Sequence, residues 1–223
     1  MIPWEHLDTA AMPEGGGDLR LMRRGQEFSI MAGAIELMNS RLSGSEEALA
    51  SLCAARIGAR RSPRILVGGL GMGFTLRAAL RDFSPDARIV VAELVPQVVD
   101  WARGSVRAVH GESLDDPRVR IHLGDVAEAI AQGDWDAILL DVDNGPDGLT
   151  RRANDALYGE AGLAAARRAL NPGGVLAVWS SAPHRAFSQR IRRSGLTVEE
   201  ITVRANRAKR GAKHVIWLGQ APG

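Results

Sequence analysis

Short apolar runs alternate with helix-like segments through most of the chain. The apolar runs occupy residues 65–67, 87–93, 118–123, 136–141 and 174–179, and helix-like spacing covers residues 95–110, 125–131, 154–170 and 184–194. This repetition predicts a parallel sheet with right-handed crossovers and helices on both faces. Two further strand-like segments, 197–204 and 214–219, are joined by a basic tip without a helix, so they should pair antiparallel at the sheet edge. The pattern predicts a doubly wound α/β fold with a mostly parallel, seven-stranded sheet.

The N-terminal part of the chain has a different pattern. The first seventeen residues end in Pro-Glu-Gly-Gly-Gly and are expected to form a loosely docked leader. The segments that follow, split at Gly25 and Gly33, alternate partially and predict a small antiparallel meander. We therefore expect a leader and meander over residues 1–42 and a Rossmann-like, nucleoside-binding catalytic domain over residues 43–223.

A helix is expected to begin at the start of the second region. Ser43 or Ser45 can cap its N-terminus, and the early carboxylates of Glu46 and Glu47 suit the positive end of its dipole.

A glycine-rich turn follows the first apolar run, in the stretch RILVGGLGMGFTLR. Gly69, Gly71 and Gly73 allow positive φ and close approach of a ligand to the main chain, while the next helix presents unpaired N–H groups. Such turns also close βα units that bind nothing, so the turn alone is a weak signal. Together with the order of the strands, it predicts a nucleotide site at these three glycines.

Acidic side chains end the next two strands, at the sheet edge where open α/β sheets bind ligands. Glu93 lies twenty residues after Gly73 and can accept hydrogen bonds from ribose hydroxyls. Asp125 can accept from an adenine amino group while the Val126 N–H donates to the ring, and Asp125 can also cap the next helix. We predict that all three residues bind a cofactor.

The fourth strand ends in LLDVDNGPDG, which places Asp141 at the same edge. Asp141 is expected to face the reactive end of the cofactor, where burial can make a carboxylate a base or let it hold an acceptor amine. Asp143 and Asn144 follow directly and are candidate catalytic partners. The alternative is a turn built by Asx side chains before Gly145, a role that fits Asn144.

Composition limits the other possibilities. The single cysteine, Cys53, excludes an internal disulfide and a cysteine metal cluster, and no histidine pair has ligand spacing, so we predict no metal site. The N-terminus lacks a secretory signal pattern, and no apolar run is long enough to cross a bilayer. We expect a cytoplasmic protein without a membrane partner.

Charge is nearly balanced overall, at +2, but uneven. Nine Lys or Arg residues face only two acids between Arg185 and Lys213, so this part could meet nucleic acid. Aromatic residues for base stacking do not interleave with the charges, which favours a solvated helix face and hairpin tip. Nucleic-acid binding is therefore only a minor alternative.

The order of these motifs resembles the class I S-adenosylmethionine-dependent methyltransferase fold, with Asn171-Pro172-Gly173-Gly174 preceding the fifth strand. More narrowly, the chain resembles the spermidine synthase branch over roughly residues 18–219. The segments similar to those of the branch are Glu93-Leu94-Val95-Pro96 with Val98-Val99, Asp115 to Val119, and Leu157-Tyr158 through Gly174. The resemblance implies an enzyme that uses S-adenosylmethionine or its decarboxylated form and acts on a small-molecule acceptor.

Departures from that branch bear on the reaction. Its G-G-G-D-G-G turn carries an aspartate that holds the amine of decarboxylated S-adenosylmethionine, and the sequence places Met72 at the matching position. Its D-E-x-x-Y-H-E stretch is replaced by residues 44–49, which lack the Tyr and the His, and Tyr158 is the only tyrosine. These departures favour S-adenosylmethionine as cofactor and methyl transfer to a small molecule.

Two alternatives remain open at this point. One is spermidine synthase-like aminopropyl or alkyl transfer from decarboxylated S-adenosylmethionine, and the other is a non-catalytic or nucleic-acid-binding protein. A homodimer formed through the meander is possible.

Overall fold

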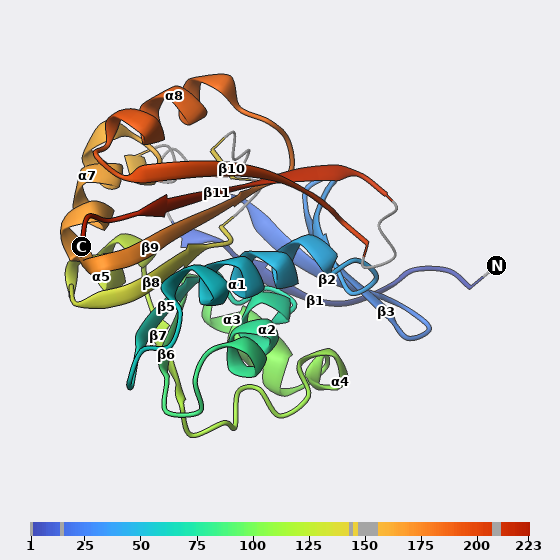
Figure 1. Cartoon of the computed structure of the whole chain (residues 1–223). Coiled ribbons are helices and arrows are strands. Elements are labelled where there is room, and N and C mark those ends of the chain that lie inside the picture. The colour runs from blue at the N-terminus through green and yellow to red at the C-terminus, as the bar shows by residue number, and fades with distance from the viewer. Residues whose placement is uncertain (1, 14–15, 143–144, 147–155, 207–210) are drawn as a thin grey trace.

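The computed structural model describes residues 2–13, 16–142, 145–146, 156–206 and 211–223. Two sheets form its framework (Figure 1). The smaller is an antiparallel sheet in the order β1-β2-β3-β4, with bounds Glu5–Ala11, Asp18–Arg24, Glu27–Ala32 and Ile35–Asn39. The predicted meander is therefore present and gains a fourth strand, β1.

The larger sheet has seven strands in the order β10-β11-β9-β8-β5-β6-β7. In chain order they are β5 (Arg64–Gly68), β6 (Arg88–Glu93), β7 (Val119–Leu123), β8 (Trp135–Leu140), β9 (Leu170–Ser180), β10 (Thr197–Arg204) and β11 (Lys213–Gln220). The five strands from β9 to β7 run parallel, whereas β11 pairs antiparallel with both β9 and β10. The predicted mostly parallel sheet with an antiparallel edge pair is confirmed.

Helices cover both faces of this sheet (Figure 1). One face carries α1 (Gly44–Ile57), α2 (Phe74–Asp82), α3 (Pro96–Arg103) and α4 (Arg107–His110). The other carries α5 (Val126–Ala131), α7 (Glu160–Ala169) and α8 (Arg185–Arg193). Strand β5 explains the uninterrupted apolar runs: Ile65 and Val67 pack into the first core and Leu66 into the second, so successive residues all need apolar side chains.

The structure differs from the expected pattern at the N-terminus. The expectation of a loosely docked leader is wrong for Glu5–Ala11, which forms β1 and pairs with β2. The Asp8 carboxylate also accepts a 2.7 Å hydrogen bond from the Trp101 indole N–H of α3. Because most of its side chains are exposed, this edge strand lacks the apolar alternation that marks a strand in sequence.

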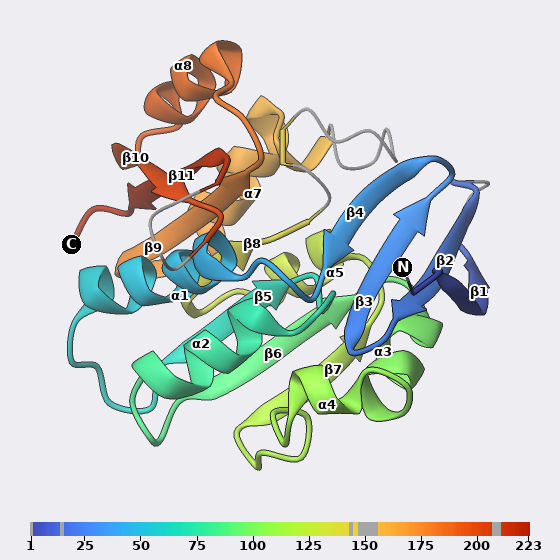
Figure 2. The ribbon, with the colours of Figure 1, turned by 90° about the vertical axis from the view of Figure 1, so that its right-hand side faces the viewer.

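The small sheet lies beyond the carboxyl ends of the parallel strands. The arrowheads of β5 and β6 point toward it (Figure 2). Strand order reverses at β5, since β6 lies on one side of it and β8 on the other. Ligands of open α/β sheets bind at such a reversal, which here is covered by the small sheet.

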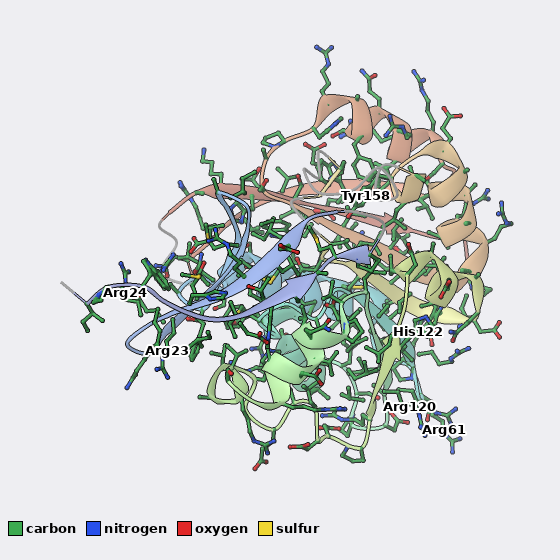
Figure 3. All side chains as sticks on the ribbon, turned by 180° about the vertical axis from the view of Figure 1, so that it is seen from behind. Arg23, Arg24, Arg61, Arg120, His122 and Tyr158 are labelled. Carbon is green, nitrogen blue, oxygen red and sulfur yellow. The ribbon has the colours of Figure 1, made fainter. Side chains whose placement is uncertain are left out.

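Several arginine side chains lie on the outside of the molecule. Arg23, Arg61 and Arg120 are exposed and lie at the periphery of the molecule (Figure 3). None of the helices in the described ranges combines the length and the apolar character needed to cross a bilayer.

Candidate functional site

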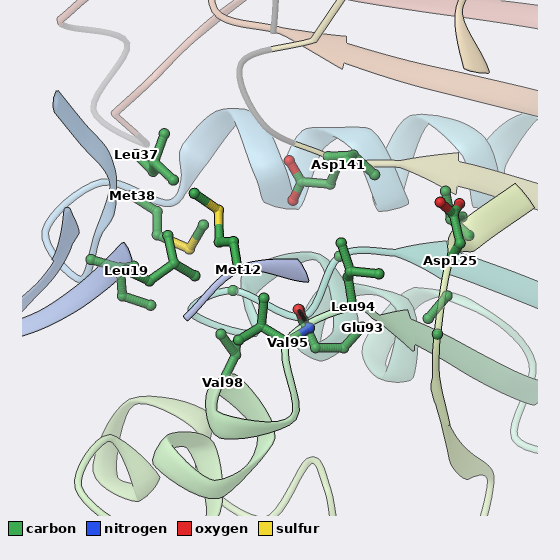
Figure 4. Close-up of a pocket in the computed structure, with 17 residues that line it drawn as sticks. Met12, Leu19, Leu37, Met38, Glu93, Leu94, Val95, Val98, Asp125 and Asp141 are labelled. Atoms are coloured by element: carbon green, nitrogen blue, oxygen red, sulfur yellow. Dashed lines mark hydrogen bonds between the residues drawn. The ribbon is translucent and has the colours of Figure 1, made fainter. Parts of the chain in front are cut away.

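A cavity opens between the two sheets at the reversal of strand order (Figure 4). Its walls include six of the seven residues predicted to bind a cofactor, namely Gly69, Gly71, Glu93, Asp125, Val126 and Asp141. The small sheet and the connection between its strands β1 and β2 supply the opposite, apolar wall, with Met12, Leu19, Ile30, Leu37 and Met38. The cavity therefore combines an apolar side with carboxylates from three different strand ends, and we refer to it as the donor cavity.

The glycine turn is built so closely that side chains would not fit. Gly69 has a φ of +88°, and a Cβ there would lie 2.5 Å from the main-chain oxygen of Asp141. Gly71 has a φ of +47°, and its Cβ would lie 2.7 Å from the Met38 sulfur. The positive φ favours glycine at both positions, and at Gly69 the main chain of Asp141 also leaves no room for a side chain, whereas the flexible Met38 side chain could move away from Gly71.

Glu93 holds this turn in place. Its Oε2 accepts a 3.0 Å hydrogen bond from the Leu70 N–H, and its Oε1 accepts a 2.9 Å bond from the Val95 N–H. Burial raises the pKa of Glu93, and these backbone donors oppose that rise. The N–H groups of Leu94 and Gly71 also stabilise the ionised carboxylate, which lies on the wall of the donor cavity.

Asp125 caps α5, since its Oδ1 accepts a 2.9 Å hydrogen bond from the Ala127 N–H. Asp125 and Val126 also line the donor cavity, at the end farthest from the small sheet's methionines in Figure 4. The cap and a ligand contact can coexist, as the sequence analysis allows.

A second cavity adjoins the first. Asp141, Gly71, Leu37 and Met38 line both cavities, while the second also reaches Glu46 of α1, Gly73, Met72 and Trp179. We call it the acceptor cavity. Gly73, predicted to bind the cofactor, lies on this second wall and not on that of the donor cavity.

Two carboxylates face the acceptor cavity from different elements. Asp141 follows β8, and its Oδ2 accepts a 2.6 Å hydrogen bond from the Thr75 hydroxyl of α2. Burial raises the pKa of Asp141 to about 6, against the effect of the Thr75 bond. Burial, with the charge of Asp141 as the next cause, raises the pKa of Glu46 to about 7. These acids can exchange a proton near neutral pH and can pair with a cation.

Sequence reasoning missed several of these residues. In the sequence, Glu46 is explained by its favourable charge at the start of a helix, and Thr75 belongs to no recognised motif. Met12 falls within the expected leader. Only the fold brings them to the site. The candidate catalytic residues Asp143 and Asn144, and Arg207, Lys209 and Arg210 of the basic tip, lie outside the described residues.

No family model matches the sequence. Relatives include polyamine aminopropyltransferases of Nitrosomonas europaea, 37% identical over 121 residues, and Mycobacterium tuberculosis, 34% identical over 125 residues. The matched stretches are 53% and 54% of this chain, but only 35% and 23% of those proteins. The chain thus matches well under half the length of these relatives.

Among solved structures, the spermidine synthase of Thermotoga maritima superimposes on 96% of this chain and 72% of its own, with a TM-score of 0.77 and 15% identity. The fold is spermidine synthase-like. The spermidine synthase-like form of the class I methyltransferase fold includes the small antiparallel sheet in front of the seven-stranded sheet, as the resemblance implies.

The preference for methyl transfer with S-adenosylmethionine is wrong. The relatives named above are aminopropyltransferases, which supports the alternative of aminopropyl transfer. The argument from Met72 also fails on structural grounds. The Met72 side chain is only 3% exposed and lines the acceptor cavity but not the donor cavity, whose wall at this turn is formed by Gly69 and Gly71. Met72 therefore does not exclude a cationic ligand, because Asp141 and Glu46 place two carboxylates on the same wall of the acceptor cavity.

Proposed function

We propose that this chain is an aminopropyltransferase that uses decarboxylated S-adenosylmethionine as donor and a small amine as acceptor. The nucleoside of the donor would occupy the donor cavity, with the ribose at Glu93 and the adenine at Asp125 and Val126. Gly69 and Gly71 would lie beside the part of the donor molecule that leads to the sulfonium. Asp141 would lie between donor and acceptor, because it lines both cavities.

The observation that carries this proposal is the charge of the two cavities. Glu46, Glu93, Asp125 and Asp141 line them, and no lysine or arginine does so among the described residues. The carboxylate of S-adenosylmethionine would therefore meet like charges without a partner, a cost that a low-dielectric site magnifies. The decarboxylated donor ends in an ammonium, which Asp141 can pair with because it lines both cavities. The site favours the donor without a carboxylate.

The chemistry required of the protein is modest. The acceptor nitrogen attacks the aminopropyl carbon bonded to sulfur, the carbon–sulfur bond breaks, and its electrons leave on the thioether of methylthioadenosine. Because the sulfonium is already a good leaving group, most of the rate would come from aligning nitrogen, carbon and sulfur. The remaining requirement is a base that keeps the attacking amine neutral, and Asp141 with Glu46 would serve.

The decisive experiment offers the purified protein both donors with a panel of linear diamines and triamines. We expect methylthioadenosine and an aminopropylated amine from the decarboxylated donor, detected by mass spectrometry. Calorimetric titrations should show tighter binding of methylthioadenosine than of S-adenosylhomocysteine, which carries the disfavoured carboxylate. Production of S-adenosylhomocysteine from S-adenosylmethionine, or tighter binding of the carboxylated pair, would overturn the proposal.

The remaining expectations from the sequence are part of this proposal. We keep a cytoplasmic location and a homodimer formed through the small sheet as predictions, to be checked by fractionation and by light scattering.

A further inference from the structure

A chain of hydrogen bonds leads away from the acceptor cavity through the start of α1. The Ser45 hydroxyl donates to Glu46 Oε2 over 2.7 Å, and the same Ser45 oxygen lies 2.8 Å from Nδ1 of His214 in β11. Ser45 and His214, which are 169 positions apart in the sequence, thus meet at one hydroxyl group.

The two ends of this chain lie in different environments. Glu46 lines the acceptor cavity, Ser45 is fully buried, and His214 is partly exposed near the start of β11. The His214 ring packs edge-on against Trp179, with 5.0 Å between ring centroids. Trp179 itself lines the acceptor cavity. The imidazole is thereby held in a defined orientation, with one ring nitrogen toward Ser45.

A serine hydroxyl has one proton, so the chain has two arrangements. With Glu46 ionised, Ser45 donates to Glu46 and accepts from a protonated Nδ1 of His214. With a proton on Glu46 Oε2, Glu46 can donate to Ser45, which then donates to a bare Nδ1. Conversion between these arrangements moves one proton from the cavity side to the imidazole, which can pass it to water from its other nitrogen.

The proposed reaction needs such an exit. An acceptor amine enters as an ammonium and must lose one proton before its lone pair can attack. The sulfonium charge is cancelled when the carbon–sulfur bond electrons pass to sulfur, and the new secondary amine leaves as an ammonium. One proton is therefore released per turnover. A ligand in the acceptor cavity would occupy the space beside Glu46, so the proton needs a path that does not cross the cavity.

We propose that Glu46, Ser45 and His214 form a proton relay that carries this proton from the acceptor amine to solvent. The inference rests on the proposed function, because it assigns the path of the proton that the proposed reaction releases. Ser45 and His214 are positioning and relay residues that act through Glu46, which would itself contact the acceptor.

Charges around Glu46 are compatible with this role. Asp141 from the end of β8 and Glu47 from α1 both disfavour a second negative charge there, so Glu46 takes up a proton readily. Arg81 lies 3.7 Å from Glu47, not from Glu46. Burial lowers the pKa of His214, so the neutral imidazole is favoured and a proton that it takes up is readily released.

The test compares Ser45→Ala and His214→Gln with the wild-type protein, using decarboxylated donor and the best diamine from the panel. The glutamine amide can keep a hydrogen bond to Ser45 but cannot carry a proton through its nitrogen. We expect kcat to fall about tenfold at pH 7 in both variants and to recover toward pH 9, where free base is abundant. Thermal melts show whether each variant is folded, and His6→Gln and Ser51→Ala serve as controls, since both lie outside the relay.

A second readout separates proton transfer from structural support. In His214→Ala, added imidazole should restore a large part of kcat with little change in KM for the diamine. Wild-type turnover combined with unchanged pH profiles in folded Ser45→Ala and His214→Gln would overturn the relay and leave the proposed function standing. Absence of aminopropyl transfer in the wild-type protein would overturn the proposed function and the relay with it.

Discussion

The hydroxyl of Thr75 lies 2.6 Å from Oδ2 of Asp141 and donates a hydrogen bond to it. The same hydroxyl lies 3.2 Å from the main-chain oxygen of Glu46. A single residue of α2 thus contacts both elements that bring carboxylates to the acceptor cavity. The bond to Asp141 favours the ionised carboxylate, so Thr75 lowers a pKa that burial alone would raise further.

Replacing Thr75 by valine should therefore raise the pKa of Asp141 above its value of about 6. Loss of a hydrogen bond to a charged group corresponds to roughly one pH unit. The acidic limb of the kcat/KM profile should move to higher pH by about that amount, with activity recovered near pH 8.5. Thr202→Val, on an exposed position of β10, is the matched control and should leave the profile in place. An unshifted acidic limb in Thr75→Val would show that Asp141 does not set it.

Asp141→Asn should abolish most turnover while leaving the affinity for methylthioadenosine nearly unchanged. The product nucleoside has neither an amine nor a sulfonium, so it does not depend on the Asp141 charge, whereas the reaction loses a base and should slow on the order of 100-fold. Calorimetry with methylthioadenosine and steady-state kinetics give the two quantities. If nucleoside affinity falls and turnover at saturation does not, Asp141 is a binding residue alone.

Glu46→Gln should stabilise the protein at alkaline pH. The pKa of Glu46 is raised from 4.5 to about 7 in the folded state, so the folded protein holds a proton that the unfolded chain releases between those values. This contribution to stability is complete below pH 4.5 and is lost as pH rises through 7, and the buried charge then costs on the order of 1 to 3 kcal/mol. Urea unfolding should show a gain of that order at pH 8 and none at pH 4.5. Glu47→Gln is the control, and an equal gain there would point to a general charge effect.

Gly69→Ala and Gly33→Ala should separate backbone strain from steric exclusion. Both glycines have positive φ, +88° and +57°, but a Cβ at Gly33 meets nothing within 4 Å whereas one at Gly69 meets the Asp141 main chain. Gly33→Ala should cost only about 1 kcal/mol and keep methylthioadenosine binding. Gly69→Ala should cost more and abolish binding, because β5 and β8 must move apart. Equal effects in urea unfolding and calorimetry would remove the steric argument.

The parallel part of the fold was predictable because its strands are buried on both faces and appear as apolar runs. Residues 88–93 of β6 differ from the expected 87–93 by one position. The expected helix over 95–110 instead divides into α3 and α4 around Gly104. The break depends on the local backbone conformation at Gly104, which the spacing of apolar residues does not predict.

The residues of the site were predictable from the sequence only where they lie at or just after the end of a strand. Gly69, Glu93, Asp125 and Asp141 follow strands, so the parallel topology brings them to one edge. Glu46 and Thr75 belong to helix starts whose place depends on tertiary packing, and Met12 comes from a segment without strand-like alternation. Met72 was misleading for a different reason, since its side chain is almost fully buried and the carboxylates beside it come from Asp141 and Glu46, outside the glycine turn.

Strand β11 occupies an internal position in the sheet, between β10 and β9, although both of these strands precede it in the chain. It also brings His214 to Ser45, while Glu199 of β10 pairs with Arg56 at the other end of α1. During synthesis on the ribosome, β9 can pair with β8, but its other edge and the whole of β10 must wait unpaired until residue 220 has emerged. The nascent chain therefore completes its sheet and its proposed exit for protons in the same step, when β11 emerges, and a ribosome stalled before β11 would display an unfinished edge to chaperones.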